Sequence, residues 1–139
     1  MSVLVDTSFV IALKNLDDED HPRAVSLFQE LLRGIHGATY TTNFVFAESI
    51  RVALARMQRR TAAIGVGEMF VSTLPGGWFM RLQHVSPEQL LDAWREFRRH
   101  ADKDLGLVDW TTVVLARHLG LGAIVSFDAG FDGIFPRLA

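Results

Sequence analysis

Hydrophobic and polar positions follow a regular order along this chain. Short apolar runs that end in a polar residue alternate with longer stretches of helical period, without an internal repeat or low-complexity segment. This order is typical of βα units built around a mainly parallel sheet. The first run, Val3–Val5, predicts a strand buried on both faces, because its residues do not alternate between apolar and polar. The pattern therefore predicts an α/β fold.

Residues that favour helix ends mark several boundaries. A helix is expected from about Pro22 to Gly34, because proline suits a first turn and glycine suits the position after a last turn. Ala38–Thr41 is rich in β-forming residues and predicts a strand. Thr42 and Asn43 are good N-caps for the long helix that follows.

The middle of the chain is strongly apolar. Residues 61–74 are expected to be helical, Pro75–Gly77 to form a turn, and Trp78–Met80 to lie at the edge of the core rather than on a partner surface. The apolar helices between Phe44 and Leu74 are candidates for contacts with another chain. Packing inside the core explains them equally well.

The last third predicts two helices and a strand. Residues 86–89 combine an N-cap serine, a first-turn proline and a glutamine placed for a capping box. A second helix is expected from Val108 or Asp109 to Gly120, and a strand over Ala123–Phe127. The side chains expected to form the buried stripe of the first of these helices are Leu90, Leu91, Trp94 and Phe97.

Size and composition narrow the class of protein. A chain of 139 residues is expected to fold as one domain over residues 1–139. The absence of cysteine excludes disulfide scaffolds, thiolate zinc sites and cysteine nucleophiles, and suits a reducing compartment. The first residues do not resemble a signal peptide or a membrane span, so a cytoplasmic protein is expected.

The net charge of −2 neither predicts nor excludes a nucleic-acid partner, so local charge must decide. Arginine pairs well with phosphate, although solvated helix faces are the more ordinary explanation of each single arginine. The acidic stretch Asp17–Asp20 is interpreted as a solvated lead-in to a helix. The clustered arginines are Arg51, Arg56, Arg59, Arg60, Arg95, Arg98 and Arg99.

Four carboxylates come from positions that a parallel sheet brings together. Asp6 and Asp128 each follow an apolar strand, and the ligand crevice of an open α/β sheet lies at the carboxyl ends of its strands. Glu48 and Asp109 fall in the first turns of helices that start at the same edge. If the first and last predicted strands are neighbours, the four acids share one cleft.

Such a cluster predicts a site for a hard divalent cation. Carboxylates a few ångströms apart raise one another's pKa, and Mg²⁺ removes this conflict while preferring oxygen ligands. A soft-metal site fits less well, because the chain lacks cysteine and pairs no histidines at ligand spacing. Surface or capping roles are expected for the five histidines, His21, His36, His84, His100 and His118.

Each acid has an ordinary alternative when taken alone. Asp6 could end a strand in a turn, Asp109 could cap a helix, Asp128 could accept in an Asx-turn, and Glu48 could be a solvated helical charge. Only the combination favours a metal site.

Four short motifs resemble those of the PIN-domain family, in the same order and with matching spacing. They are residues 3–8 (VLVDTS), 42–48 (TNFVFAE), 107–109 (LVD) and 126–128 (SFD). The chain is most similar to the VapC-type toxins of bacterial toxin–antitoxin pairs, from end to end, including residues 20–24 and 131–133.

The resemblance implies a three-layer α/β/α sandwich and a Mg²⁺-dependent endoribonuclease, with Mn²⁺ as a substitute metal. It further implies an RNA substrate cut by metal-activated water, a VapB-type antitoxin, a homodimer and no membrane partner. Asp6, Glu48, Asp109 and Asp128 become the expected catalytic and metal-binding acids. By the same resemblance, Thr7 is expected to support a carboxylate or a metal-bound water.

Two further positions bear on the site. Asp104 is a candidate outer-shell acid, with a solvated loop aspartate as its alternative. Many relatives carry a serine shortly before the third acid, where this chain has Gly106. The missing hydroxyl leaves the metal ligands intact and is expected to affect their positioning.

Other functions remain open at this point. An aspartyl-phosphate phosphatase also places an aspartate after its first strand, but its usual second aspartate is here Ser8. A phospho-receiver domain would want another acid beside Asp6, and none is present. A housekeeping RNA-processing PIN nuclease and a PIN fold used only for binding are the remaining alternatives.

Overall fold

The computed structural model describes residues 1–71 and 79–139. Within these residues, each of the first three strands is followed by two α-helices, and one 3₁₀ turn separates the last two of the five strands. The strands are β1 (Val3–Val5), β2 (Thr39–Thr42), β3 (Met80–Gln83), β4 (Ala123–Val125) and β5 (Arg137–Leu138). The helices are α1 (Thr7–Lys14), α2 (His21–Leu32), α3 (Asn43–Met57), α4 (Arg60–Val71), α5 (Pro87–Arg99), α6 (Leu107–His118) and the 3₁₀ turn η1 (Ala129–Phe131).

The strands form one parallel sheet in the order β3-β2-β1-β4-β5. In the centre, β1 pairs with β4 through Val3 opposite Ala123 and Val5 opposite Val125. β1 and β4, the strands that precede Asp6 and Asp128, are therefore neighbours. This is the arrangement on which the predicted shared cleft depends.

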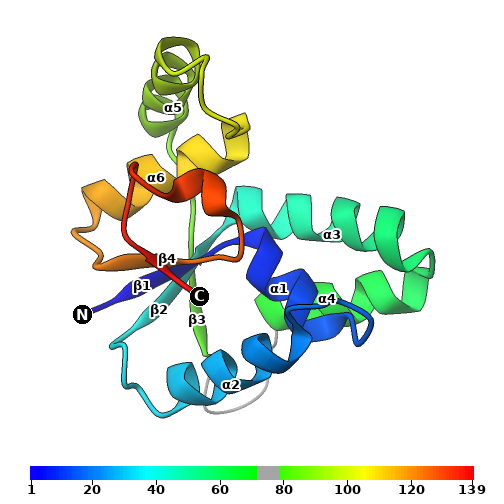
Figure 1. Cartoon of the computed structure of the whole chain (residues 1–139). Coiled ribbons are helices and arrows are strands. Elements are labelled where there is room, and N and C mark those ends of the chain that lie inside the picture. The colour runs from blue at the N-terminus through cyan, green and yellow to red at the C-terminus, as the bar shows by residue number, and fades with distance from the viewer. Residues whose placement is uncertain (72–78) are drawn as a thin grey trace.

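Helices cover both faces of the sheet in three layers (Figure 1). Val3 and Val5 face the core formed with α1, α2, α3 and α4, whereas Leu4 faces the core formed with α5 and α6. Because successive strand residues point to opposite faces, a short continuous apolar run such as β1 serves both cores. The predicted α/β/α sandwich with a parallel sheet is confirmed.

Most predicted helix ends are confirmed by their hydrogen bonds. The hydroxyl of Thr42 accepts from Val45 N at 3.0 Å at the start of α3. At the start of α5, Ser86 and Gln89 exchange the two hydrogen bonds of a capping box. Gly34 has a positive φ of 72° just beyond α2, in the left-handed conformation that glycine adopts without steric cost.

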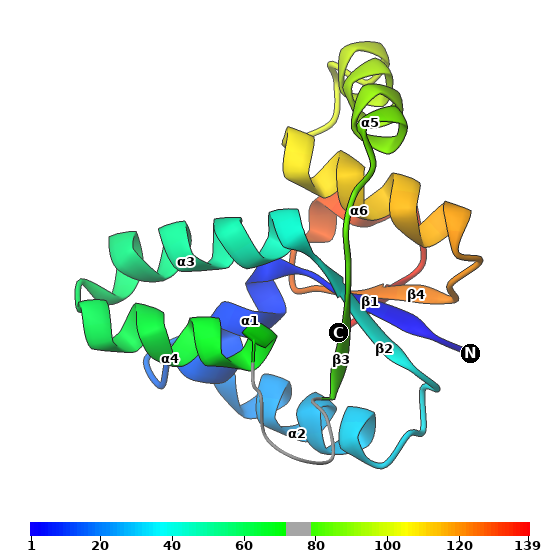
Figure 2. The same cartoon turned by 180° about the vertical axis from the view of Figure 1, so that it is seen from behind.

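The two outer strands β3 and β5 are absent from the sequence prediction. They are short and lie at the edges of the sheet, with β3 at the front edge in Figure 2. Met80, expected at the edge of the core, is 6% exposed and begins β3. The predicted turn Pro75–Gly77 lies outside the described residues, as does the end of the predicted helix beyond Val71.

The expected buried stripe on α5 is wrong for three of its four residues. Leu91 is 48% exposed, Trp94 45% and Phe97 38%. The helix lies at one end of the molecule, over α6, and Ala93 is its buried residue (Figures 1 and 2). The amphipathic pattern identifies the apolar face of α5 correctly, but residues 1–71 and 79–139 leave that face exposed.

Candidate metal centre

Asp6 is a buried carboxylate at the carboxyl end of β1. It is 2% exposed and caps the start of α1. Its Oδ2 accepts from the Ser126 hydroxyl at 2.9 Å and from the Ser8 hydroxyl at 3.2 Å, and more weakly from Ser8 N at 3.4 Å. Its Oδ1 is buried without a hydrogen-bond partner. One oxygen is thus held by the protein, and the other is free for a ligand.

Two serine hydroxyls connect Asp6 to the segment that carries Asp128. Ser8 and Ser126 lie 2.9 Å apart through their hydroxyl oxygens. Phe127 N donates to Ser8 Oγ at 2.9 Å, and Asp128 N donates to Ser126 Oγ at 3.0 Å. These hydrogen bonds fix the end of β1 against the chain that follows β4.

Asp109 lies in the first turn of α6, at the edge where the parallel strands end. Its Oδ2 accepts from the backbone N–H of Gly106 at 2.8 Å. Burial, followed by repulsion from Asp6, Glu48 and Asp128, raises the pKa of Asp109 to about 7. Burial likewise raises the pKa of Asp6 to about 6, against the opposing effect of the Ser126 hydrogen bond.

Glu48 and Asp128 complete the group from two further segments. Glu48 is half-buried on α3, one turn beyond its N-cap Thr42. Asp128 is half-buried and precedes η1, where its Oδ1 accepts from Gly130 N at 2.8 Å. Asp128 follows β4 by three residues rather than ending it, because Ser126 and Phe127 lie outside the strand.

The structure brings all four predicted acids into one neighbourhood, since the other three each repel the charge of Asp109. Within residues 1–71 and 79–139, however, no three acidic or histidine side chains are already arranged to hold a metal ion. The four acids therefore form an open cluster in this conformation. The free Oδ1 of Asp6 and an all-carboxylate donor set suit a hard cation such as Mg²⁺.

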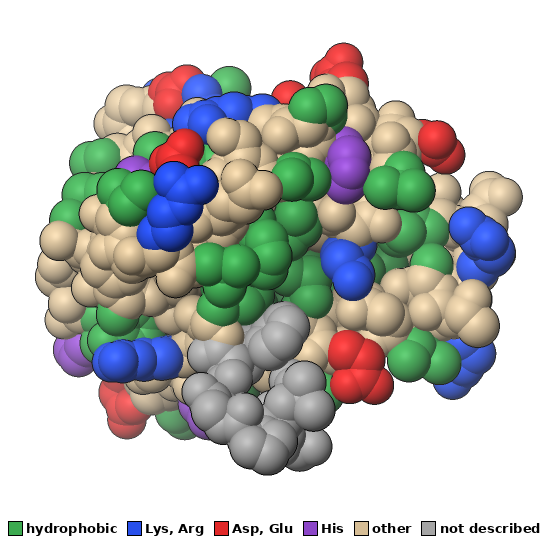
Figure 3. All heavy atoms as spheres, turned by 90° about the horizontal axis from the view of Figure 1, so that it is seen from below, with side chains coloured by type: hydrophobic (Ala, Val, Ile, Leu, Met, Phe, Trp, Pro, Cys, Tyr) green, Lys and Arg blue, Asp and Glu red, His purple; other side chains and the backbone are tan. Residues whose placement is uncertain are grey.

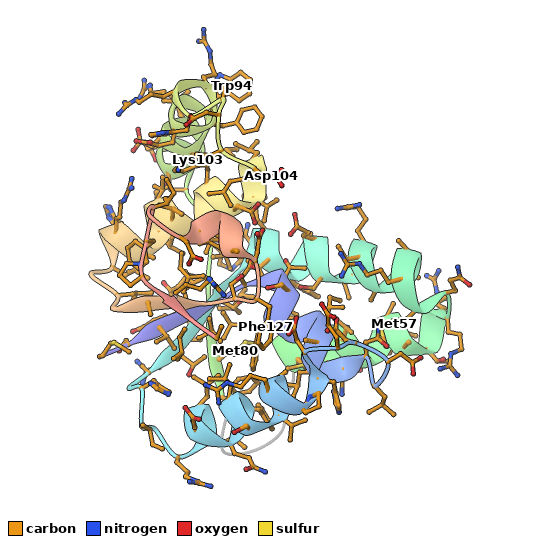
Figure 4. The ribbon with its side chains drawn as sticks, in the orientation of Figure 1. Met57, Met80, Trp94, Lys103, Asp104 and Phe127 are labelled. Carbon is orange, nitrogen blue, oxygen red and sulfur yellow. The ribbon has the colours of Figure 1, made fainter. Side chains whose placement is uncertain are left out.

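The two supporting residues differ in position. Thr7 is 6% exposed, and its buried hydroxyl lacks a hydrogen-bond partner beside Asp6. Asp104 is exposed in the segment that leads into α6, on the side toward the start of α3 (Figure 4). Thr7 therefore remains a candidate for the site, whereas the exposure of Asp104 fits its alternative as a solvated loop aspartate.

Sequence reasoning missed the roles of Ser8, Ser126 and Arg56. Each serine is separated from an acid by one residue, and that spacing was a usable signal. Arg56 and residues 18–20 border a hollow of about 390 Å³ that also includes Asp128 and Phe127. Arg56 further lines a neighbouring groove of about 520 Å³ with Lys14, Arg59 and Met57. Figure 4 labels one lining residue of each, Phe127 in the hollow and Met57 in the groove.

Three of the five histidines have contacts away from the cluster. The ring of His21 lies 2.8 Å from the carbonyl oxygen of Ala12, and His36 lies 2.8 Å from a Glu30 oxygen. His100 contacts Glu96 at 3.0 Å and stacks on Trp110. These contacts agree with the expected capping and surface roles.

Solved structures with the same fold include several toxin–antitoxin proteins. The crystal structure of VapC20 from Mycobacterium tuberculosis, described as a sarcin-ricin loop cleaving toxin, matches with a TM-score of 0.82 and 27% identity, over 94% of this chain and 93% of that one. FitAcB from Neisseria gonorrhoeae matches with a TM-score of 0.68 and 19% identity, over 99% of this chain and 96% of that one.

Sequence comparison leads to the same group of proteins. The 23S rRNA-specific endonuclease VapC20 of Mycobacterium tuberculosis strain H37Rv is 29% identical over 130 residues, which are 94% of this chain and 92% of the relative. The PIN domain family model matches residues 3–134. The matched residues include all four acids and every strand except β5. The chain is therefore a member of the PIN domain family.

Proposed function

We propose that this PIN-domain chain is a Mg²⁺-dependent endoribonuclease and the toxin of a VapBC-type toxin–antitoxin pair, acting as a single domain over residues 1–139. The observation that carries the proposal is the convergence of Asp6, Glu48, Asp109 and Asp128 at one edge of the sheet. Family membership favours a nuclease over the aspartyl-phosphate alternatives. The free Oδ1 of Asp6 supports direct binding of the cation.

The residues of the site have separate tasks in this proposal. A bound divalent cation supplies charge neutralisation at the scissile phosphate and lowers the pKa of water. Ser126 and Ser8 donate hydrogen bonds to one oxygen of Asp6, and the other oxygen, which has no hydrogen-bond partner, would bind the cation. Gly106 N and Gly130 N orient Asp109 and Asp128 in the same way. In this proposal the Thr7 hydroxyl supports a carboxylate or a metal-bound water, and its lack of another hydrogen-bond partner is consistent with that role.

Arg56 is the proposed contact for the RNA backbone next to the acids. It lines the hollow that includes Asp128 and the groove that includes Lys14 and Arg59. The positively charged side chains along this path can neutralise RNA phosphates on one side of the cleavage position. A guanidinium group is suited to this, because it forms two parallel hydrogen bonds with a phosphate. The target of VapC20 makes 23S rRNA the first substrate to test.

The proposed partners are a VapB-type antitoxin and a second copy of this chain, with both components in the cytoplasm. α2 and α4 carry exposed apolar residues, including Leu32, Ile64 and Val71. In the view from below, apolar side chains gather in the middle of the face (Figure 3). Such a patch suits an apolar antitoxin segment. Among the described helices, none has the length and apolar character needed to cross a membrane.

The test is RNA cleavage by the purified chain with Mg²⁺, with EDTA, and as Asp6→Asn. The proposal predicts that only the unsubstituted protein with Mg²⁺ cleaves among these samples, and the control Glu68→Gln, at an exposed acid of α4, should cleave normally. Equal activity in all samples would remove the metal mechanism. Incubation with acetyl phosphate followed by intact-mass measurement tests the aspartyl-phosphate alternatives. A small, basic, DNA-binding antitoxin encoded just upstream would favour the toxin over a housekeeping nuclease.

A further inference from the structure

Strand β5 carries a partly buried arginine, Arg137, beside the segment that bears Asp128. Its guanidinium donates three hydrogen bonds. Nε and Nη2 donate to the two carboxylate oxygens of Asp132 at 2.8 and 3.0 Å, and Nη1 donates to the backbone carbonyl oxygen of Ser126 at 3.2 Å. Arg137 therefore contacts the chain on both sides of Asp128.

These contacts close a loop of residues 126–132, here called the Asp128 loop. Ser126 precedes Asp128 by two residues, and Asp132 follows it by four. Within the loop, Phe131 is fully buried in the core formed with α5 and α6 and anchors the 3₁₀ turn η1. The guanidinium supplies the polar anchor. A two-point pairing with a carboxylate has a fixed geometry, which most surface ion pairs lack.

The backbone of Ser126 is held by β5 on both sides. Its N–H donates to the carbonyl oxygen of Leu138 at 3.1 Å, and its carbonyl oxygen accepts from Arg137. The Ser126 hydroxyl in turn donates to Asp6 Oδ2 at 2.9 Å and accepts from Asp128 N at 3.0 Å. The position of β5 is thus transmitted through one serine to two of the four acids.

From these contacts we infer that Arg137 is a positioning residue, which holds the Asp128 loop and the Ser126 hydroxyl in place for cation binding. The inference rests on the proposed function, because it concerns the metal centre of that site. Hydrogen bonding to Asp132, and less strongly the charges of Asp132 and Asp128, raise the pKa of Arg137, so its guanidinium stays charged. A contact with an RNA phosphate fits less well, because Asp132 already occupies one two-donor edge of the guanidinium and Ser126 binds its remaining nitrogen.

The first test is the Mn²⁺ affinity of the RNA-free protein, measured by isothermal titration calorimetry. Arg137→Gln should bind Mn²⁺ about tenfold more weakly, as expected when an outer contact of a metal ligand is lost. Arg137→Lys keeps the charge but not the two-point pairing, so it should recover only part of the loss. Wild-type affinity in folded Arg137→Gln would overturn the inference.

Arg23→Gln is the matched control. Arg23 pairs with Glu30 and donates to the main-chain oxygen of Ala139, just beyond β5, at 3.0 Å. Its substitution therefore loosens the same end of the chain away from the acids, and Mn²⁺ affinity should stay that of the wild type. An equal loss of affinity in Arg23→Gln and Arg137→Gln would show a general loosening of β5 and contradict a specific positioning role.

Asp132→Asn tests the same pairing from an exposed position, so the test stands even if Arg137→Gln does not fold. The Asp132 side chain is 57% exposed, and its replacement should leave the fold intact. Asp132→Asn should weaken Mn²⁺ binding less than Arg137→Gln, because an amide oxygen still accepts a hydrogen bond. The double variant should be no weaker than Arg137→Gln, since both changes break one pairing. Unchanged affinity in Asp132→Asn, or fully additive losses, would refute closure of the loop by this pair.

Single-turnover cleavage separates positioning from RNA contact. Arg137→Gln should raise the Mg²⁺ concentration needed for half-maximal cleavage and leave the dependence on RNA concentration unchanged. The opposite pattern would show a phosphate contact and overturn the inference. A wild-type chain that neither binds Mn²⁺ nor cleaves RNA would refute the proposed function, whereas a normal wild type with an unaffected Arg137→Gln would refute only the positioning role.

Discussion

Only one of the two oxygens of the Asp6 carboxylate has hydrogen-bond partners. Ser126 and Ser8 donate to Oδ2, while Oδ1 is buried without a partner. An unpaired buried oxygen costs free energy in the folded protein, and a bound cation would recover that cost. Under the proposed function, the two serine hydroxyls hold Asp6 in position and do not react themselves.

Ser126→Ala should weaken cleavage by about 10- to 100-fold, because outer hydrogen bonds orient the ligands of a metal. The Ser126 hydrogen bond lowers the pKa of Asp6, so its loss should also move the acidic limb of the pH–rate profile upward. Ser126→Thr should recover part of both effects. Ser26→Ala, at an exposed serine of α2, is the control. An unchanged pH profile for Ser126→Ala would exclude the positioning role.

The raised pKa values of Asp6 and Asp109 predict how stability depends on pH without metal. Their folded values are about 6 and about 7, against 3.8 for the unfolded groups. Between the unfolded pKa of 3.8 and the folded values, the folded state binds more protons than the unfolded state. The free energy of unfolding should therefore fall as the pH rises through 7. Urea unfolding in EDTA at pH 5 and pH 8 measures this change. Asp109→Asn should reduce the pH dependence, and an undiminished dependence in that variant would contradict the assignment.

Gly106 is the N-cap residue of α6 and has no side chain to cap the helix. Its backbone conformation would also allow a serine. Its φ of −78° and ψ of 175° are extended, and an added Cβ would lie 3.7 Å from Asp109 Oδ2, an ordinary contact. Gly106→Ser should therefore raise the unfolding free energy by about 0.3 kcal/mol through N-capping. Cleavage should match or exceed that of the wild type. A stable variant with weaker cleavage would show that the glycine itself is needed.

At the scale of elements, a close approach between η1 and the segment before α6 joins two parts of the site. A Cβ added at Gly130 would lie 3.0 Å from both the Asp104 carbonyl oxygen and Asp128 Oδ1. Only a glycine lets these groups pack without displacement, so the start of α6 and Asp128 stay together.

Gly130→Ala should lower the unfolding free energy by about 1–3 kcal/mol, as overpacking does, and should reduce cleavage more than stability explains. The matched control is Gly65→Ala on α4, where an added Cβ meets nothing within 4 Å. That control should gain about 0.5–1 kcal/mol, since alanine favours a helix. Urea unfolding and single-turnover cleavage of both variants measure the difference. Equal behaviour of the two variants would refute the packing argument.

Local signals predicted the inner elements better than the outer ones. Thr42 and the capping box at Ser86 set helix starts through their own hydrogen bonds, so the sequence alone revealed them. The edge strand β3 has no β-branched residue and is recruited by its pairing with β2, which sequence periodicity does not record. The apolar stripe on α5 was recognised but its exposure was not, because exposure depends on how α5 packs over α6, which a sequence pattern does not record.

At the scale of the whole molecule, the position of the acids could be predicted and their exact arrangement could not. Asp6 and Asp128 follow neighbouring parallel strands, and sheet topology brings strand ends to one edge. The rotamers of Glu48 and Asp109 depend on longer-range packing and repulsion, which sequence patterns do not encode. The roles of the four acids as metal ligands stay a prediction.

The most direct measurement of that prediction is Mn²⁺ binding to the RNA-free protein, followed by electron paramagnetic resonance. The account predicts saturable binding by the wild type, at least tenfold weaker binding by Asp6→Asn and by Asp109→Asn, and unchanged binding by Glu68→Gln, at an exposed acid of α4. Equal Mn²⁺ affinity in all four proteins would contradict the claim that these carboxylates hold the metal.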